Sequence, residues 1–368
     1  MPNLMALELG IIICPNCSSK NTKKYGIIKK KLQNTQRYLC NSCQKTFILE
    51  TQSKNKTYPT RIILNTLSYY NLGHSQAQTS KIISQKHKTK VPQKTISNWL
   101  NEYKNICTFQ KLRKEAKKLY PAEEIIEQHT LMHNNLPYNF QIHKAKLYLL
   151  FHTKLYNNEF GNNSKYCEPT KQYLEKIPTN KFPHHIFQPK QGEQEELNGL
   201  ARSSQIKIET LNITKLQKDN FACKLASLAL NLAATNKQRH EAIQNFFLIN
   251  DSTTIAAEIP VYLTHDDIFY YKIRNFTIKF LEKYETPITG HIDLLQIRNG
   301  LIHILDYKPD SHLKQVQEHA VQQLTIYALA LASRTKLDLA SFKCAFFDEN
   351  NYFEFFPLHC VYEKKIER

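Results

Sequence analysis

The stretch covering residues 290–327 constrains the fold of this chain most strongly, because it predicts two paired strands followed by a helix. Residues 288–297 form an alternating apolar run that is typical of a strand. Asn299-Gly300 is a strong two-residue hairpin signal, and residues 301–307 form a second aliphatic run. We therefore expect an antiparallel hairpin here.

A helix is expected directly after this hairpin, over residues 311–333. Asp310 or Ser311 is placed to cap its first turn. Within the helix, Gln323 and Tyr327 are four residues apart and should share one face.

Three charged residues interrupt the apolar pattern of the hairpin. Asp293 lies in the first run, and Asp306 and Lys308 flank Tyr307 at the end of the second. The period of two in a strand places Asp306 and Lys308 on one face, where the hairpin can bring Asp293 to them. Carboxylates hold Mg²⁺ or Mn²⁺, and a lysine beside them can orient an attacking water, so the pattern indicates phosphodiester hydrolysis. A surface hairpin with solvated charges is the alternative.

The motifs GHID, ILDYK and QLTIYALAL occur in this order and resemble the RecB-like branch of the PD-(D/E)XK nuclease superfamily, whose pattern is G-x-x-D, D-Y-K and Q-x-x-x-Y. The similarity covers roughly residues 219–357. It implies that Asp293 and Asp306 bind metal and that Lys308 is catalytic. It further implies that the residues matching the family's helix, Gln323 and Tyr327, contact DNA or support the site.

The same resemblance suggests two further site residues and a core topology. His240, with Glu241 beside it, matches a histidine that such enzymes often carry on the preceding helix, and Glu258 matches an acid on the first core strand. Either could complete the magnesium site, and Glu258 could instead lie beside the metal ligands without binding the ion. The expected α-β-β-β-α-β core, with one more strand at 352–356, runs through residues 219–249, 253–263, 287–297, 300–307, 311–333 and 341–347.

The charge of the chain is segregated along its 368 residues, a length that predicts about two or three domains. Residues 1–120 carry 22 Lys and Arg against 4 Asp and Glu, whereas residues 121–368 carry 28 of each sign. A confined basic region predicts a polyanionic partner, because grouped Lys and Arg release counterions from phosphates.

Two C-x-x-C pairs near the start predict a zinc ribbon with a closed, structural Zn²⁺ site made by Cys14, Cys17, Cys40 and Cys43. A redox role for the pairs is the alternative. The ribbon resembles those in front of many prokaryotic transposases, which indicates nucleic-acid contact, although some ribbons bind only proteins. Its linker offers a basic cluster for that contact, Lys29, Lys30 and Lys31.

Three short helices are expected between residues 58 and 104, at 61–72, from His74 or Ser75 to residue 86, and from Pro92 onward. The last should bury Ile96, Trp99 and Leu100 and expose Lys94, Thr95, Ser97 and Asn98. It resembles the recognition helix of transposase-type helix-turn-helix domains, which reads base edges in the major groove. A plain three-helix bundle is the alternative.

Residues 105–210 are less informative. Helices are expected at 112–118, from Pro121 and at 144–156, and residues 157–199 read as a long loop. Six histidines in this region match no ligand spacing, so we expect surface or packing roles for His129, His133, His143, His152, His184 and His185.

Together these features predict a metal-dependent DNA endonuclease with an α/β restriction-endonuclease-like core. The expected domains are a zinc ribbon (1–52), a small all-α helix-turn-helix domain (58–106), a helical or irregular connector (107–212) and the nuclease domain (213–368). DNA is the expected partner and a homodimer a reasonable assembly. No run is apolar enough for a membrane span, so we expect a soluble protein of a prokaryotic cytoplasm, associated with the nucleoid.

Three alternatives stay open for the function. A mobile-element protein could use the same chemistry, and a DNA-binding regulator could carry an inactive nuclease fold. An iron-sulfur exonuclease of the same branch is disfavoured, because only three cysteines lie near the core, Cys223, Cys344 and Cys360.

Overall fold

The computed structural model describes most of the chain outside the N-terminus, the C-terminal tail and several internal segments. The described residues are 12, 14, 16–28, 35–48, 57–133, 136–152, 164–177, 214–216, 220–276, 278, 281 and 287–361. None of the described helices has both the length and the hydropathy needed to cross a membrane.

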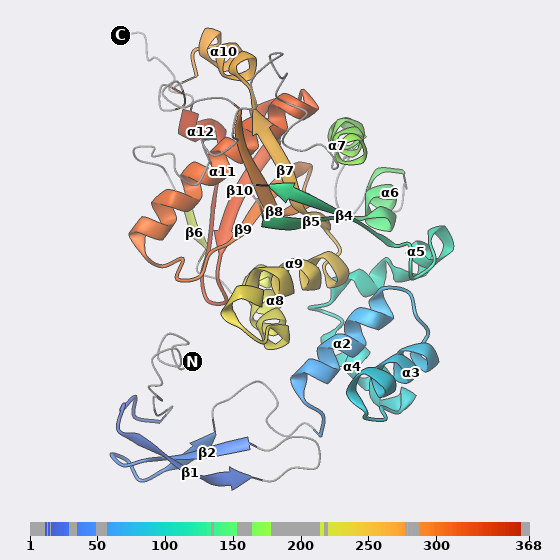
Figure 1. Ribbon diagram of the computed structural model, residues 1–368, viewed down its shortest axis with the longest axis vertical. Helices are drawn as coiled ribbons and strands as arrows, with labels where there is room; N and C mark the ends of the chain where they lie inside the picture. The colour runs from blue at the N-terminus through green and yellow to red at the C-terminus, as the bar shows by residue number, and fades with distance from the viewer. Residues whose placement is uncertain are drawn as a thin grey trace, which may run out of the picture.

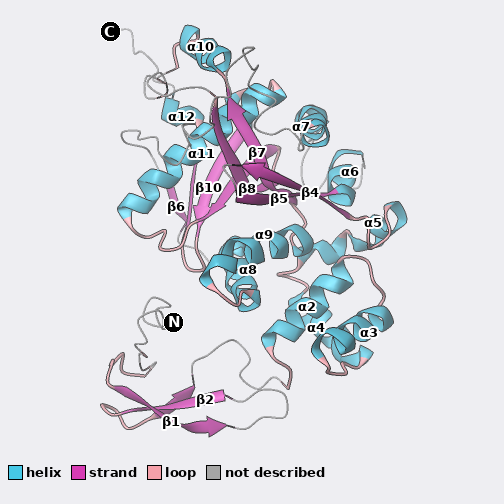
Figure 2. Ribbon diagram, viewed as in Figure 1, coloured by secondary structure: helices cyan, strands magenta, loops and turns pink. Residues whose placement is uncertain are grey.

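A mixed sheet of eight described strands forms the centre of the fold (Figures 1 and 2). Its order is β4-β5-β7-β8-β9-β10-β11-β6, and β9 pairs with β10 in parallel through a helical crossover. The strands are β4 Ile126–His133, β5 Leu136–His143, β6 Thr214–Leu216, β7 Thr254–Leu263, β8 Ile288–Arg298, β9 Leu301–Tyr307, β10 Phe342–Phe347 and β11 Tyr352–Phe355.

The β8–β9 hairpin has the predicted turn, because Asn299 and Gly300 both adopt left-handed backbone angles, with φ of 53° and 72°. Two positive φ values are what a type I′ turn requires. The turn therefore fixes which residues of β8 and β9 face each other.

Helices cover both faces of the sheet at β10. Phe342 and Phe346 belong to a buried cluster with α11 (Lys314–Thr335), whereas Phe347 packs on Phe247 of α9 (Arg239–Asn250) with ring centroids 5.5 Å apart. The alternation follows from the period of two along a strand. The remaining helices of this part are α8 Phe221–Ala229, α10 His265–Ile273, the 3-10 turn η8 Leu339–Ser341 and α12 Leu358–Val361.

The helix expected over residues 219–249 is instead broken into α8 and α9, with 3-10 turns at Leu230–Leu232 and Asn236–Gln238 between them. The Asn231 side chain donates to the carbonyls of Ser227 and Leu228, which offers the backbone an alternative to a continuing helix. In addition, α10 follows β7 and precedes β8 along the chain, and this helix was not predicted.

The predicted cap of α11 is wrong. The helix begins at Lys314, its N-cap is Leu313, and no side chain caps it. Asp310 has a left-handed backbone (φ 59°). The backbone N–H and the hydroxyl of Ser311 both donate to Asp348 Oδ2, at 3.1 and 2.7 Å, so this distant acid rather than the helix binds Ser311.

The predicted connector contributes to the sheet, which corrects two expectations. No helix starts at Pro121. Instead, β4 and β5 pair with each other in antiparallel orientation, and β5 pairs with the edge of β7. The expected loop at 157–199 contains a helix, α7 Ser164–Lys176. Two further helices, α5 Arg113–Leu119 and α6 Lys144–His152, overlap helices that the sequence predicts, whereas the 3-10 turn η1 Thr108–Lys111 was not predicted.

The three helices expected before the connector are present, as α2 Thr60–Asn71, α3 Gln76–His87 and α4 Gln93–Tyr103. Ser75 and Gln78 form a capping box at the start of α3. On α4 the predicted inward residues Ile96, Trp99 and Leu100 are buried, while Thr95 is half-buried and three polar residues are exposed, Lys94, Ser97 and Asn98.

A separate three-stranded antiparallel sheet precedes these helices, with β1 Thr22–Ile28, β2 Thr35–Cys40 and β3 Thr46–Ile48. The rings of Tyr38 and Phe47 stack across β2 and β3, with centroids 5.8 Å apart. Of the predicted cysteines, Cys40 ends β2 and Cys43 lies between β2 and β3, whereas Cys14 and Cys17 precede β1.

Candidate active site

Three carboxylates form a row across adjacent strands of the central sheet. The register of β7 with β8 places Glu258 opposite Asp293, and the register of β8 with β9 places Asp306 next in line. We call these three residues the acid row. Asp306 is almost completely buried, at 3 % exposure. The hairpin and the neighbouring strand therefore bring together the acids that the sequence indicated.

The backbone of β7 is distorted at Glu258, the residue that β7 contributes to the acid row. Glu258 has a left-handed conformation with φ of 53°, which is strained for a residue with a long side chain. Within the row, the N–H of Tyr307 donates to Asp293 Oδ2 at 3.1 Å instead of to a strand carbonyl. Such local strain concentrates at functional sites, where the surrounding structure compensates for it.

Helix α9 supplies two side chains to the acid row. His240 Nδ1 lies 3.3 Å from Asp293 Oδ2. One turn later, Gln244 Nε2 donates to Glu258 Oε1 at 2.6 Å and to Asp293 Oδ1 at 3.3 Å. The spacing of four residues puts both on one face of the helix. Sequence reasoning missed Gln244, although its position relative to His240 is a signal that could have found it.

Lys308 connects the acid row to α11. Its Nζ lies 2.7 Å from Asp306 Oδ2 and donates to Gln323 Oε1 at 2.9 Å. Gln323 Nε2 in turn donates to the Tyr327 hydroxyl at 2.7 Å. The lysine ammonium is therefore held in one position by a carboxylate and by a side-chain amide that is itself fixed.

The acids of the row have strongly shifted ionisation. Burial raises the pKa of Glu258 to about 8, with a further contribution from the charge of Asp293. Burial likewise raises the pKa of Asp306 to about 7, against the effect of Lys308. Burial opposes ionisation of Asp293 too, but His240 outweighs it and holds the pKa of Asp293 below its usual range. Crowded, buried carboxylates of this kind would be stabilised by a cation.

Lys308 keeps its proton in this environment. Burial alone would lower the pKa of its ammonium, yet the charges of Asp306 and Asp293 raise it above its usual range. The pKa of His240 is also raised, because the contact with Asp293 outweighs the effect of burial. The site thus combines acceptor oxygens for a cation with a fixed positive charge.

The donor set of the acid row fits a hard divalent ion. Carboxylate oxygens are the ligands that Mg²⁺ and Mn²⁺ prefer. Among the described residues, the three acids do not bring one ligand oxygen each within 4.8 Å of one another, as a compact metal cluster would. Water ligands, which Mg²⁺ readily retains, would complete such a site.

A stacked ring pair that the sequence did not suggest borders the acid row. The rings of Tyr138 on β5 and His291 on β8 are 4.0 Å apart and nearly parallel, at 8°. His291 Nδ1 lies 4.0 Å from Glu258 Oε2. This contact depends on the pairing of β5 with β7, which no local pattern reveals.

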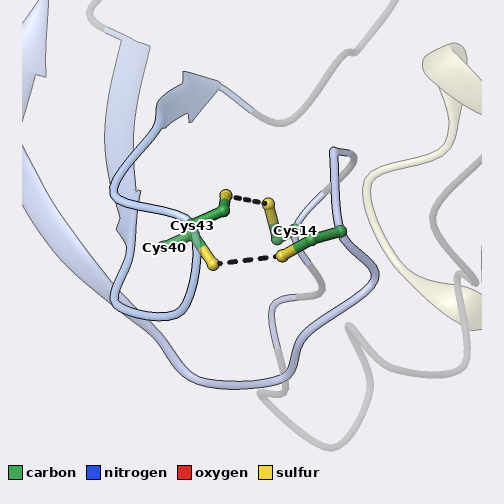
Figure 3. Close-up of side chains that lie close together, drawn as sticks. Cys14, Cys40 and Cys43 are labelled. Atoms are coloured by element: carbon green, nitrogen blue, oxygen red, sulfur yellow. Dashed lines mark hydrogen bonds between the residues drawn. The ribbon is translucent and has the colours of Figure 1, made fainter.

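The four predicted zinc ligands come together beside the small three-stranded sheet. Their sulfur atoms all lie within 4.8 Å of one another, and two pairs, Cys14 with Cys43 and Cys17 with Cys40, are each 3.6 Å apart (Figure 3). A tetrahedral ion with Zn–S bonds of about 2.3 Å places sulfurs about 3.8 Å apart, so the cluster fits Zn²⁺.

The two cysteine knuckles have the same backbone geometry. In each, the residue four positions after the first cysteine donates its N–H to that cysteine's carbonyl at 2.9 Å, and this residue, Ser18 or Gln44, has a φ of 57°. In the second knuckle, the backbone N–H of Cys43 lowers the pKa of the Cys40 thiol, whereas the pKa of the neighbouring Cys17 thiol is raised, so Cys40 is the more readily ionised of the two.

The predicted DNA-contacting residues are only partly described. Lys94, Ser97 and Asn98 share the exposed side of α4, with Thr95 at its margin. The basic cluster predicted in the ribbon linker, Lys29, Lys30 and Lys31, lies outside the described residues.

The comparisons with known proteins bear on the C-terminal part of the chain. Residues 186–352 match the PD-(D/E)XK nuclease superfamily. The matched region contains the whole acid row, Lys308, and the α9 and α11 residues that contact them. Members of the superfamily are mostly metal-dependent nucleases. Neither a curated protein nor a solved structure matches the chain.

Gln244 offers a test of how the acid row is held. We expect Gln244→Ala to lower the affinity for Mn²⁺ about 10- to 100-fold, because its amide orients Glu258 and Asp293. Isothermal titration with Mn²⁺ measures this directly. Asn245→Ala, the next residue on α9, lines a cavity on another side of the helix and should keep the wild-type affinity. Equal affinities in both variants would rule out this role for Gln244.

Proposed function

We propose that the protein is a metal-dependent DNA endonuclease of the RecB-like branch, directed to its substrate by a zinc ribbon and a helix-turn-helix. The observation that carries the proposal is the contact of Asp293, Asp306 and Lys308 on two paired strands, inside the region that matches a nuclease superfamily. The order of the motifs along the chain supports the choice of branch.

Asp293 and Asp306 would hold Mg²⁺ or Mn²⁺, with Glu258 and His240 as further ligands or as their supports. When bound, the metal would neutralise charge on the scissile phosphate and lower the pKa of a water molecule. Gln244 orients two of the acids by donating to both.

Lys308 serves as a positioned cation in this proposal. Without a metal, the charges of Asp306 and Asp293 hold the pKa of its ammonium above the usual range. The contacts with Asp306 and Gln323 fix the ammonium group, so it can donate a hydrogen bond to the attacking water or to a phosphate oxygen. Tyr327 holds Gln323 in place and thereby supports the lysine.

DNA targeting is assigned to the basic N-terminal third. The exposed side of α4 carries Lys94, Thr95, Ser97 and Asn98, whose side chains suit base edges and phosphates in a major groove. The ribbon would add phosphate contacts through Lys29, Lys30 and Lys31. The excess of positive charge in residues 1–120 supports this division of roles.

The substrate class can be tested with end-labelled duplex DNA, single-stranded DNA and RNA of one sequence. We expect internal cuts in DNA that EDTA prevents and that added Mg²⁺ or Mn²⁺ restores. Tight DNA binding without cleavage under any metal would instead favour a regulator with an inactive nuclease fold. Cutting of RNA alone would contradict the assignment of DNA as substrate.

A further inference from the structure

A buried polar contact joins α2 to α9, although these helices are far apart in the sequence. Asn71 Nδ2 donates to Asn250 Oδ1 at 2.8 Å, and Asn250 Nδ2 donates to Ser68 Oγ at 3.0 Å. Both asparagines are fully buried. A buried amide needs its partners, so this contact fixes the register of one helix on the other.

The apolar side chains around this contact form a single core. One contiguous cluster contains Leu67 of α2, Trp99 of α4, Phe246 of α9 and Leu305 of β9. It therefore extends from the three-helix unit, α2–α4, to the strand that carries Asp306. Units joined by linkers normally move relative to each other unless a large hydrophobic interface holds them, and here the core is shared.

Arg113 adds a second connection. Its guanidinium donates to the carbonyls of Tyr70 and His74, both at 2.6 Å, and to that of Gly73 at 3.1 Å. Arg113 lies on α5, whose Ala116 belongs to the buried hydrophobic cluster of the central eight-stranded sheet. We call this sheet the catalytic sheet because it carries the acid row. The turn between α2 and α3 is thus fixed to the sheet independently of α9.

Helix α9 faces both the acid row and the three-helix unit. His240 and Gln244 reach the carboxylates. Other residues of α9, including Glu241 and Asn245, line a cavity of about 430 Å³ that is also lined by Arg61 of α2. Helix α9 therefore sets the position of the acid row relative to the three-helix unit.

From these contacts we infer that the three-helix unit and the catalytic sheet form one rigid body, so that the protein cuts DNA at a fixed distance from the sequence that α4 binds. This inference rests on the proposed function. A nuclease with a flexibly linked reader would instead cut over a range of distances, because its linker samples many lengths.

The rigid body can be tested without any nuclease activity. Trp99 is the only tryptophan in the sequence, so its fluorescence reports on α4. In denaturant titrations of the zinc-loaded full chain, we expect the Trp99 signal and the far-ultraviolet circular dichroism of the α/β core to change at the same midpoint, as in one cooperative unit. Loss of the Trp99 signal at a lower concentration, with most of the dichroism retained, would overturn the inference.

The fixed distance is tested by mapping cuts. Duplexes that bind the Lys308→Ala variant are selected from a random library, and the wild-type protein then cuts them with Mn²⁺. We expect cuts at one distance from the selected sequence, to within about one base-pair step of 3.4 Å. Cuts spread over many distances, or cuts without any selected sequence, would overturn the inference while leaving the nuclease assignment intact. Absence of cutting would overturn the proposed function itself.

Discussion

Lys308→Ala should reduce DNA cleavage by about 10²- to 10³-fold, the loss typical of removing one preorganised hydrogen-bond donor from an active site. The Nζ atom of Lys308 lies 2.7 Å from Asp306 and 2.9 Å from Gln323, so alanine removes the one described ammonium group at the acid row. Single-turnover cleavage of a labelled duplex measures the effect. Duplex affinity, measured in EDTA, should stay at the wild-type value, because the residues that we propose for DNA targeting lie on other elements.

Lys314→Ala is the matched control for this variant. Lys314 lies in the first turn of α11, where its side chain is 89 % exposed and pairs only loosely with Glu318, at 3.8 Å. We expect wild-type cleavage, since an exposed pair of this kind contributes little. Equal cleavage by Lys308→Ala and Lys314→Ala would remove Lys308 from the mechanism.

Cys40→Ser should remove the zinc from the ribbon and unfold it. In zinc-finger peptides the metal contributes about 10–16 kcal/mol at pH 7, more than so small a sheet can replace by packing. DNA binding should weaken, and the slope of log K against log salt should fall by about 0.9 for each phosphate that the ribbon no longer neutralises. Zinc content by atomic absorption and gel shifts at several salt concentrations measure both effects.

Cys360→Ser serves as the control for the zinc variant. Cys360 is half-buried on α12, packs against the core of the central sheet and donates weakly to the carbonyl of Phe356. We expect it to keep the zinc content and the salt slope of the wild type. A full zinc content in Cys40→Ser would contradict the four-cysteine site.

Local sequence patterns were sufficient to predict the hairpin and the helices of the three-helix unit. Asn299-Gly300 is almost sufficient to specify the turn of the β8–β9 hairpin, because both residues accept positive φ. Likewise, the buried and exposed sides of α4 follow from the spacing of apolar and polar residues within the helix itself. The acids could be placed because the turn fixes the strand register, which brings Asp293 to Asp306.

Features that depend on distant partners could not be predicted. The prediction that Ser311 caps α11 was wrong because Asp348, 37 residues away, accepts both hydrogen bonds that Ser311 donates. The β4–β5 hairpin exists because the edge of β7 is available for pairing. Gln244 has a visible spacing from His240, but its role requires Glu258 and Asp293 to be already in place. Tertiary contacts decide these cases.

Nicking of supercoiled plasmid by the purified protein tests the central claim most directly. Wild-type protein and Asp306→Asn are incubated with Mg²⁺ or Mn²⁺ beside reactions in EDTA, and open-circular DNA is followed over time. The acid row predicts nicking that needs the metal and is lost in Asp306→Asn, an uncharged variant of nearly the same shape. Nicking that persists in EDTA or in Asp306→Asn would contradict a metal-dependent nuclease site in the acid row.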